Sequence, residues 1–430
     1  MNISTKPSLL HFLDERKALR GYIAICGANE LASQMLNVAI GWYVYSATRT
    51  PMSLAYVGLT QFLPSIALFP LAGQAADRFD RRKVIGFSMF LQTLCLGMFC
   101  AWSAAAAPSA RPGLGPVYLL LLILGAARAF SAPALSAILP QMIGRDEFPR
   151  AVAASTSVFQ ICTILGPAIG GITYAISGPA TFALATGLYF LAMMEARLLA
   201  SGRTTGSSRQ HALTEKGVLT GVRYIRSNRL LLSLISLDLF AVLLGGATAL
   251  LPIYAKDILL VGPIGLGCLR CAPSAGAAVI GFVLAHRSIE RGAGKRMLAC
   301  VGGFGLAIVV FALSTNFVLS VTALLAAGGF DMVSMVIRQT LLQISTPDAM
   351  RGRVSAVNHV FIGASSELGE FESGITAALF GAAPAALLGG LGTLAVVALW
   401  TVLFPELRGA SEMVIAETAL PSSEHSLADA

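Results

Sequence analysis

The sequence contains few charged residues. Asp, Glu, Lys and Arg make up 12% of its 430 residues, whereas 56% are hydrophobic. A soluble domain carries about 25% charged residues. The chain also contains apolar runs longer than about 18 residues, which can cross a bilayer as helices. We therefore predict an all-α, polytopic membrane protein, in which the net charge of +8 concerns orientation in the membrane and not binding to nucleic acid.

The sequence also lacks the motifs of membrane enzymes and ATP-driven pumps. It has no H-E-x-x-H or G-x-S-x-G, and Gly294-Lys295 lacks the upstream glycine of a phosphate-binding loop. The seven cysteines have no disulfide-framework spacing, which indicates packing thiols. We expect no catalytic residues, no cofactor and no metal site, since the histidines are scattered at His11, His211, His286, His359 and His425.

Twelve apolar runs are long enough to span the hydrocarbon of a bilayer. They divide the chain into a six-helix bundle (1–200), a linker (201–229), a second six-helix bundle (230–404) and an acidic tail (405–430) predicted to be disordered. The break between the ninth and tenth runs, at Ser314-Thr315-Asn316, is the least marked. The runs cover residues 21–46, 53–75, 84–106, 116–139, 152–175, 179–200, 230–254, 263–286, 297–315, 318–342, 354–378 and 383–404.

The basic residues predict the orientation of these runs. Of the 30 Lys and Arg, 24 fall on the side that holds both termini, whereas Arg49, Arg111 and Lys256 fall on the other side. Cytoplasmic loops carry the excess of Lys and Arg, so both termini should be cytoplasmic. In the linker, Val218, Val222 and Ile225 share one helical face, which predicts a short amphipathic helix resting on the inner leaflet.

One charged turn and one glycine-rich run resemble known motifs. The turn from Gly73 to Lys83 reads G-x-x-x-D-R-x-x-R-R-K and resembles the loop between helices 2 and 3 of the major facilitator superfamily. A plain positive-inside loop is the alternative. Gly166-Pro167-Ala-Ile-Gly170-Gly171 resembles the antiporter motif of the same superfamily, although small-residue packing alone also explains it.

Three further segments are similar to the bacterial subgroup of enterobactin-exporter-like and drug antiporters. They run from Asp238 to Tyr254, from Thr346 to Ala356 and from Phe404 to Arg408. This resemblance implies two pseudo-symmetric halves of six helices, with spans 1, 4, 7 and 10 around a central cavity. It also implies a secondary transporter that exports a siderophore or a drug-like molecule in exchange for H⁺ by alternating access. An importer of the same fold and a non-transporting membrane sensor are the alternatives.

Ionisable residues within the spans are the candidates for substrate binding or proton coupling, because a charge in hydrocarbon is costly. Spans 1, 4 and 7 carry one each, span 10 carries two, and span 11 carries three carboxylates that face either Arg270, water or the outer mouth. The alternative for the charges of spans 1, 4, 7 and 10 is internal pairing that only holds the bundle together. The candidates are Glu30, Arg128, Asp238, Asp331, Arg338, Glu367, Glu370 and Glu372.

The charged turn is interpreted as a gate. Gly73 would let span 2 approach span 11, and Asp77 would lie at the N-terminus of span 11. Arg78, Arg81 and Arg82 would bind carboxylates or carbonyls across the seam between the halves. We expect a monomer in the cytoplasmic (inner) membrane of a bacterium, whose partners are the small-molecule substrate, the coupling ion H⁺ and the lipid bilayer, and not nucleic acid.

Overall fold

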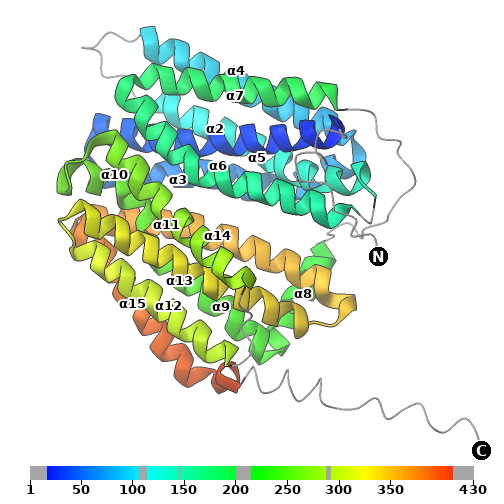
Figure 1. Ribbon diagram of the computed structural model, residues 1–430, viewed down its shortest axis with the longest axis vertical. Helices are drawn as coiled ribbons and strands as arrows, with labels where there is room; N and C mark the ends of the chain where they lie inside the picture. Colours follow the sequence, from blue (N-terminus) through cyan, green and yellow to red (C-terminus); the bar gives the residue numbers. More distant parts are fainter. Residues whose placement is uncertain (1–16, 106–113, 145–146, 200–214, 287–291, 410–430) are drawn as a thin grey trace, which may run out of the picture.

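The computed structural model describes residues 17–105, 114–144, 147–199, 215–286 and 292–409, and these are almost entirely helical (Figure 1). Residues 201–214 of the predicted linker and 410–430 of the predicted acidic tail fall outside them, whereas residues 405–409, at the start of the tail predicted to be disordered, are helical and bury Leu407. The first group of helices is α2 (Lys17–Thr48), α3 (Pro51–Arg78), α4 (Arg81–Ala105), α5 (Gly115–Met142), α6 (Phe148–Ile176) and α7 (Gly178–Leu198).

The second group begins with the short α8 (Glu215–Ser227) and continues with α9 (Arg229–Leu244). The chain then passes through a 3-10 turn η1 (Ala247–Leu250), α10 (Leu251–Ile253) and a π-helical turn η2 (Tyr254–Ile258). The remaining helices of this group are α11 (Gly262–His286), α12 (Ala293–Leu313), α13 (Phe317–Ile344), α14 (Asp348–Phe380) and α15 (Ala382–Leu403).

Helical structure occupies the place of every predicted apolar run. Within the described ranges, ten helices are long and apolar enough to cross a membrane. The fold class is therefore confirmed, whereas a count of twelve spans stays a prediction for α3 and α14. The predicted break between the ninth and tenth runs is confirmed. α12 ends at Leu313, and the side chain of Asn316 caps α13 by accepting a hydrogen bond from the Leu319 N–H (3.1 Å).

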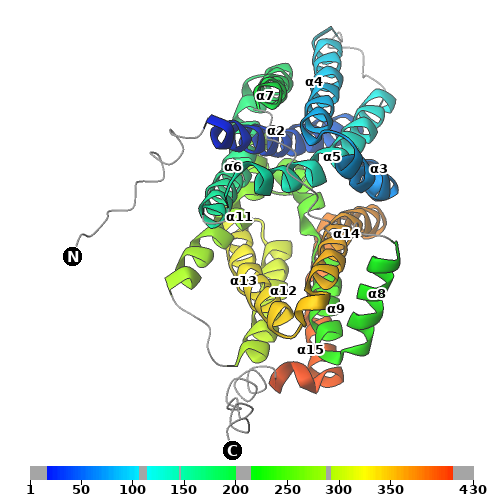
Figure 2. The ribbon, with the colours of Figure 1, turned by 90° about the vertical axis from the view of Figure 1, so that its right-hand side faces the viewer.

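The two groups of helices lie one above the other in Figure 1 and meet along two seams (Figure 2). In one seam α6 packs against α11, and in the other α3 packs against α14. One hydrophobic cluster lies wholly within α2–α7. Another joins Val38, Tyr45 and Leu54 of the first group to residues of α10, α11 and α13.

The glycines of α6 permit its close packing on two neighbours. A Cβ atom on Gly170 would lie 2.8 Å from the Met35 Cα of α2. A Cβ atom on Gly171 would lie 2.5 Å from the Pro263 carbonyl oxygen of α11. Both distances are too short for a side chain. The run from Gly166 to Gly171 therefore lets α6 pack closely against α2 of its own group and α11 of the second group.

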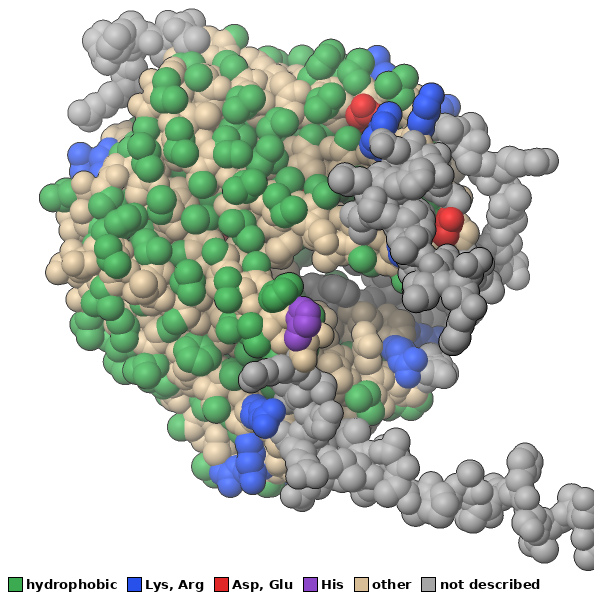
Figure 3. Space-filling view, viewed as in Figure 1, with side chains coloured by type: hydrophobic (Ala, Val, Ile, Leu, Met, Phe, Trp, Pro, Cys, Tyr) green, Lys and Arg blue, Asp and Glu red, His purple; other side chains and the backbone are tan. Residues whose placement is uncertain are grey.

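The contacts between the groups lie toward the predicted external ends of the helices. Gly171 is near the external end of α6, and Pro263 is at the external start of α11. Asp257 of η2 binds Arg49 (2.6 Å) and accepts a hydrogen bond from Tyr45. At the other end, a Cβ atom on Gly73 would meet no atom within 4 Å. Figure 3 shows a hollow between the groups on the side away from α10.

The prediction that the amphipathic helix rests on the inner leaflet is wrong. Val222 and Ile225 of α8 pack against Val354 and Val357 of α14. A Cβ atom on Gly221 would already lie 3.0 Å from a Val357 methyl group. The first turns of α14 offer an apolar surface that matches the face of α8, so this face is buried against protein and not in lipid. The side chain of Val218 is not among those that the structure describes.

Candidate substrate and coupling site

Arg128 lies midway along α5 and is surrounded by polar groups from three other helices. It donates hydrogen bonds to Oε1 of Gln61 on α3 (3.2 Å) and to Oγ of Ser33 on α2 (2.5 Å). It also interacts electrostatically with the carboxylates of Glu30 on α2 and Glu367 on α14. Glu367 belongs to the second group of helices, so the interaction crosses between the two groups.

Glu30 is held in place by two donors. Its Oε1 atom accepts from Nε2 of Gln34 (2.7 Å), one turn further along α2, and from Oγ1 of Thr163 on α6 (3.2 Å). These bonds fix the carboxylate on the side of α2 that faces Arg128. Glu30 therefore belongs to the same polar cluster as Arg128, as its position in span 1 predicts.

Two of the three glutamates of α14 join this cluster. Glu367 interacts electrostatically with both Arg128 and Glu370. Glu370 accepts from Oγ1 of Thr248 in η1 (3.2 Å) and interacts with Arg270 of α11. Glu372 instead accepts from Oγ1 of Thr376 on its own helix (2.7 Å). The structure thus separates Glu372 from the other two carboxylates, which the sequence could not do.

Arg270 is a member of the site that the sequence placed within a span but did not select as a candidate. Within the described ranges its Nε atom is buried and has no hydrogen-bond partner. A Cβ atom on Gly41 of α2 would lie 3.8 Å from its guanidinium, so Arg270 reaches the first group of helices. An arginine donor buried without a partner is costly, and a bound anionic or carbonyl group could satisfy it.

We name the group formed by Glu30, Arg128, Arg270, Glu367 and Glu370 the central charge cluster. Its members come from α2, α5, α11 and α14, and therefore from both groups of helices. It holds two arginines and three carboxylates, so it can bind an anion or a cation and can exchange a proton. No group of His, Cys, Asp or Glu within the described residues is arranged to hold a metal ion.

Asp238 and Arg338 form a separate buried ion pair between α9 and α13. The Asp238 residue is 8% exposed and Arg338 is 3% exposed. Arg338 thus points into the second group of helices and does not extend to the membrane surface. Asp331, seven residues earlier on α13, is exposed. The structure therefore brings Asp238 and Arg338 together and leaves Asp331 apart from them.

Asp238→Asn should destabilise the protein strongly, because it leaves the Arg338 cation buried without a counter-charge. Breaking a buried pair in this way costs about 3–5 kcal/mol. Thermal unfolding of the purified protein in detergent measures the effect. Adding Arg338→Met should restore much of the lost stability, and Asp331→Asn is the matched control with little expected change. An unfolding temperature of Asp238→Asn equal to wild type would contradict the pairing.

A cluster at the external ends closes the molecule on that side. Arg49 and Tyr45 bind Asp257, and Lys256 donates to the Ser46 hydroxyl. The Lys256 ammonium also lies 5.1 Å from the centre of the Trp42 ring. Sequence reasoning counted Arg49 and Lys256 only as external charges. Their pairing joins the end of α2 to η2, which are far apart in the sequence.

The residues of the predicted gate make contacts within the first group. Arg81 donates to the Ala137 carbonyl of α5 (3.0 Å). Arg82 donates to the Leu199 carbonyl after α7 (2.9 Å). Arg78 and Gly73 do not reach α14 in this state, and the Asp77 side chain lies outside the description. A latch across the seam stays a prediction for the state in which the cytoplasmic side is closed.

Comparison with known proteins agrees with this architecture. The model of the family described as "Major Facilitator Superfamily" matches residues 24–370. The enterobactin exporters EntS of Escherichia coli O139:H28 (strain E24377A / ETEC) and Shigella boydii serotype 18 (strain CDC 3083-94 / BS512) are 28% identical over 328 residues. That alignment covers 75% of this chain and 76% of each exporter.

Solved transporter structures share the fold at low identity. The nucleoside transporter NupG has a TM-score of 0.68 and 14% identity, over 90% of this chain and 99% of that chain. A bacterial homologue of the human lysosomal transporter Spinster, inward-facing and unoccupied, has a TM-score of 0.68 and 14% identity. That match covers 93% of this chain and 97% of the homologue.

Proposed function

This chain belongs to the Major Facilitator Superfamily of membrane transporters, and we propose that it exports a small molecule in exchange for protons by alternating access. The proposed substrate is a siderophore or a drug-like molecule. The observation that carries the proposal is the central charge cluster, because its arginines and carboxylates come from both groups of helices and Arg270 of α11 reaches Gly41 of α2.

The arrangement of contacts supports alternating access. The two groups touch toward the external ends of α3, α6, α11 and α14, where Asp257 also ties them together. A hollow lies between them on the other side (Figure 3). Rocking of one group against the other around a fixed central site would exchange these two states. The central charge cluster lies between the groups, where such a movement changes its distances.

The central charge cluster supports proton coupling. An arginine close to a carboxylate favours its charged form, whereas a carboxylate that loses this partner in a water-poor site favours the protonated form. Glu367 and Arg128 are carried by different groups, so rocking would bring them together and separate them. Glu367 can then take up a proton on one side of the membrane and release it on the other side.

Two features support the proposed substrate classes. Arg270 and Arg128 offer guanidinium donors to an anionic or oxygen-rich molecule such as a siderophore, in keeping with the printed function of the exporter relatives. The three carboxylates Glu30, Glu367 and Glu370 offer an alternative attraction for a lipophilic cation. We further propose a monomer in a bacterial cytoplasmic membrane, with both termini in the cytoplasm.

Transport into inverted membrane vesicles with an acidic interior tests the proposal. The vesicle membranes contain the overproduced protein. Uptake of catecholate siderophores and of lipophilic cationic drugs into the vesicles is measured. We expect accumulation of one class inside the vesicles, and we expect a protonophore to abolish it. Accumulation that persists in the presence of the protonophore would contradict proton coupling. Movement only in the opposite direction would make the protein an importer.

A further inference from the structure

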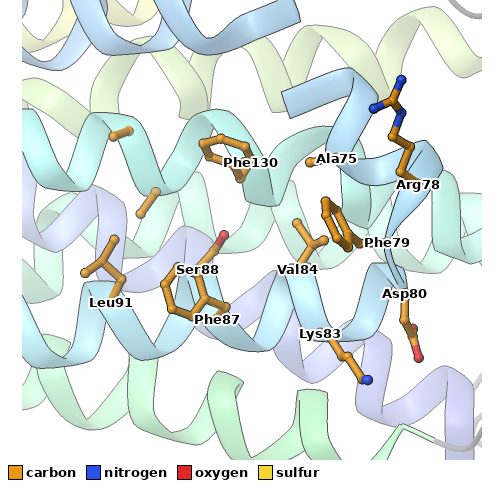
Figure 4. Close-up of a pocket in the computed structure, with 12 residues that line it drawn as sticks. Ala75, Arg78, Phe79, Asp80, Lys83, Val84, Phe87, Ser88, Leu91 and Phe130 are labelled. Carbon is orange, nitrogen blue, oxygen red and sulfur yellow. The ribbon is translucent and has the colours of Figure 1, made fainter. Parts of the chain in front are cut away.

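An apolar groove of about 490 Å³ lies between α3 and α4, with α5 behind it. α5 packs against both of these helices and supplies Ala126, Ala127 and Phe130 to the groove. Figure 4 shows Phe87, Leu91 and Phe130 along one part of the groove, and Arg78, Asp80 and Lys83 at its other end, where Arg78 and Lys83 flank Phe79 on opposite sides. The groove is distinct from the central charge cluster, whose residues do not line it.

The groove faces outward at the depth of the cytoplasmic leaflet. Phe79 and Phe87 at its edge are 66% and 67% exposed, which is unusual for large aromatic side chains unless lipid covers them. The basic turn from Arg78 to Lys83 marks the cytoplasmic end of α3 and α4. The groove starts at this turn and extends along α4 toward the middle of the membrane.

Among the residues whose side chains the structure describes, the charges at the mouth of the groove are not balanced. Asp80 accepts from the Arg82 backbone N–H (3.1 Å), and its carboxylate lies 3.5 Å from Nε of Arg82. Arg78 and Lys83 are exposed and have no ion-pair partner among the residues that the structure describes. The one described acid at the mouth is thus engaged, and two cations remain for an external anion.

A second groove of about 590 Å³ lies on the other side of α4, between α4 and the end of α7. Both grooves are lined by Asp80, Lys83 and Phe87. Lys83 therefore stands at the mouth of both, and Phe87 separates them. Two apolar channels that share one cationic mouth match the shape of a molecule with two hydrocarbon chains and one anionic head.

We propose that the first turns of α4 bind an anionic glycerophospholipid of the cytoplasmic leaflet. Its phosphate lies between Arg78 and Lys83, one acyl chain follows the groove along Phe87 and Leu91, and the other follows the groove beside α7. Basic pockets between membrane helices on the cytoplasmic side bind such head groups, and each Lys or Arg near the surface contributes about 1 kcal/mol. A free phosphate would leave both apolar channels empty.

Native mass spectrometry of the full-length protein with added dioleoylphosphatidylglycerol tests the proposal. The double variant Arg78→Ala with Lys83→Ala should bind this lipid about thirtyfold more weakly, since each contact of about 1 kcal/mol is a factor of about five. The matched control removes the same charge from the exposed start of α12, through Lys295→Ala with Arg296→Ala, and should bind like wild type. Dioleoylphosphatidylcholine, with the same chains, should bind weakly and equally to all three proteins.

A second variant tests the apolar part of the site. Ala126→Phe fills the groove in front of α5 and should weaken binding of dioleoylphosphatidylglycerol while leaving Arg78 and Lys83 in place. Unchanged binding by both the charge variant and Ala126→Phe would overturn the proposal. An equal loss in the α12 control would reduce the effect to general surface attraction. Competition by inorganic phosphate as strong as by the lipid would reduce the site to one for free anions.

Discussion

Arg128→Ala should reduce proton-driven efflux about a hundredfold and should also lower stability. The substitution removes the cation that interacts electrostatically with Glu30 and Glu367, so both carboxylates lose a favourable interaction. It also removes the hydrogen bonds to Gln61 and Ser33. Efflux from cells that produce equal amounts of wild type and variant measures the effect.

Two further variants separate charge from geometry at this position. Arg128→Lys keeps the charge but loses the planar pair of donors to Gln61 and Ser33, so an intermediate rate is expected. Arg128→Ala with Glu367→Gln removes both charges and should regain stability without regaining proton-driven efflux. Wild-type efflux by Arg128→Ala would show that the central charge cluster has no role in transport.

Glu367→Gln should abolish proton-driven efflux and keep downhill exchange of substrate. The amide cannot carry a proton, but it has nearly the same size and still accepts a hydrogen bond. Reconstituted protein measures both reactions, one with a pH gradient and one with a substrate gradient alone. Glu372→Gln is the matched control on the same helix, because its carboxylate binds Thr376 and does not enter the central charge cluster. Gradient-driven accumulation by Glu367→Gln would assign coupling to Glu30 or Asp331.

The helices could be predicted from the sequence because the types of residue along the chain mark where each helix begins and ends. Apolar runs of membrane length and the turn residues between them place the starts of α3 at Pro51, α7 at Gly178 and α11 at Gly262. The close packing of α6 likewise follows from glycines that leave room for a neighbouring backbone. These features are local, so one sequence carries them.

The partners of each charge could not be predicted in the same way. Spacing along a helix places Asp331 and Arg338 on one face, but it does not show that Arg338 reaches Asp238 on α9. It does not show which of Glu367, Glu370 and Glu372 faces an arginine. The amphipathic pattern of α8 predicts an apolar partner without identifying it as α14. Each of these contacts depends on how distant helices pack.

Proton movement driven by substrate tests the central claim most directly. Purified protein is reconstituted in liposomes that contain a pH-sensitive dye, and a substrate identified in the vesicle assay is added as a gradient without any pH difference. Substrate leaving through the protein should drive protons in the opposite direction, and Glu367→Gln should move substrate without moving protons. Substrate transport by the wild type with no change in internal pH would contradict proton-coupled transport.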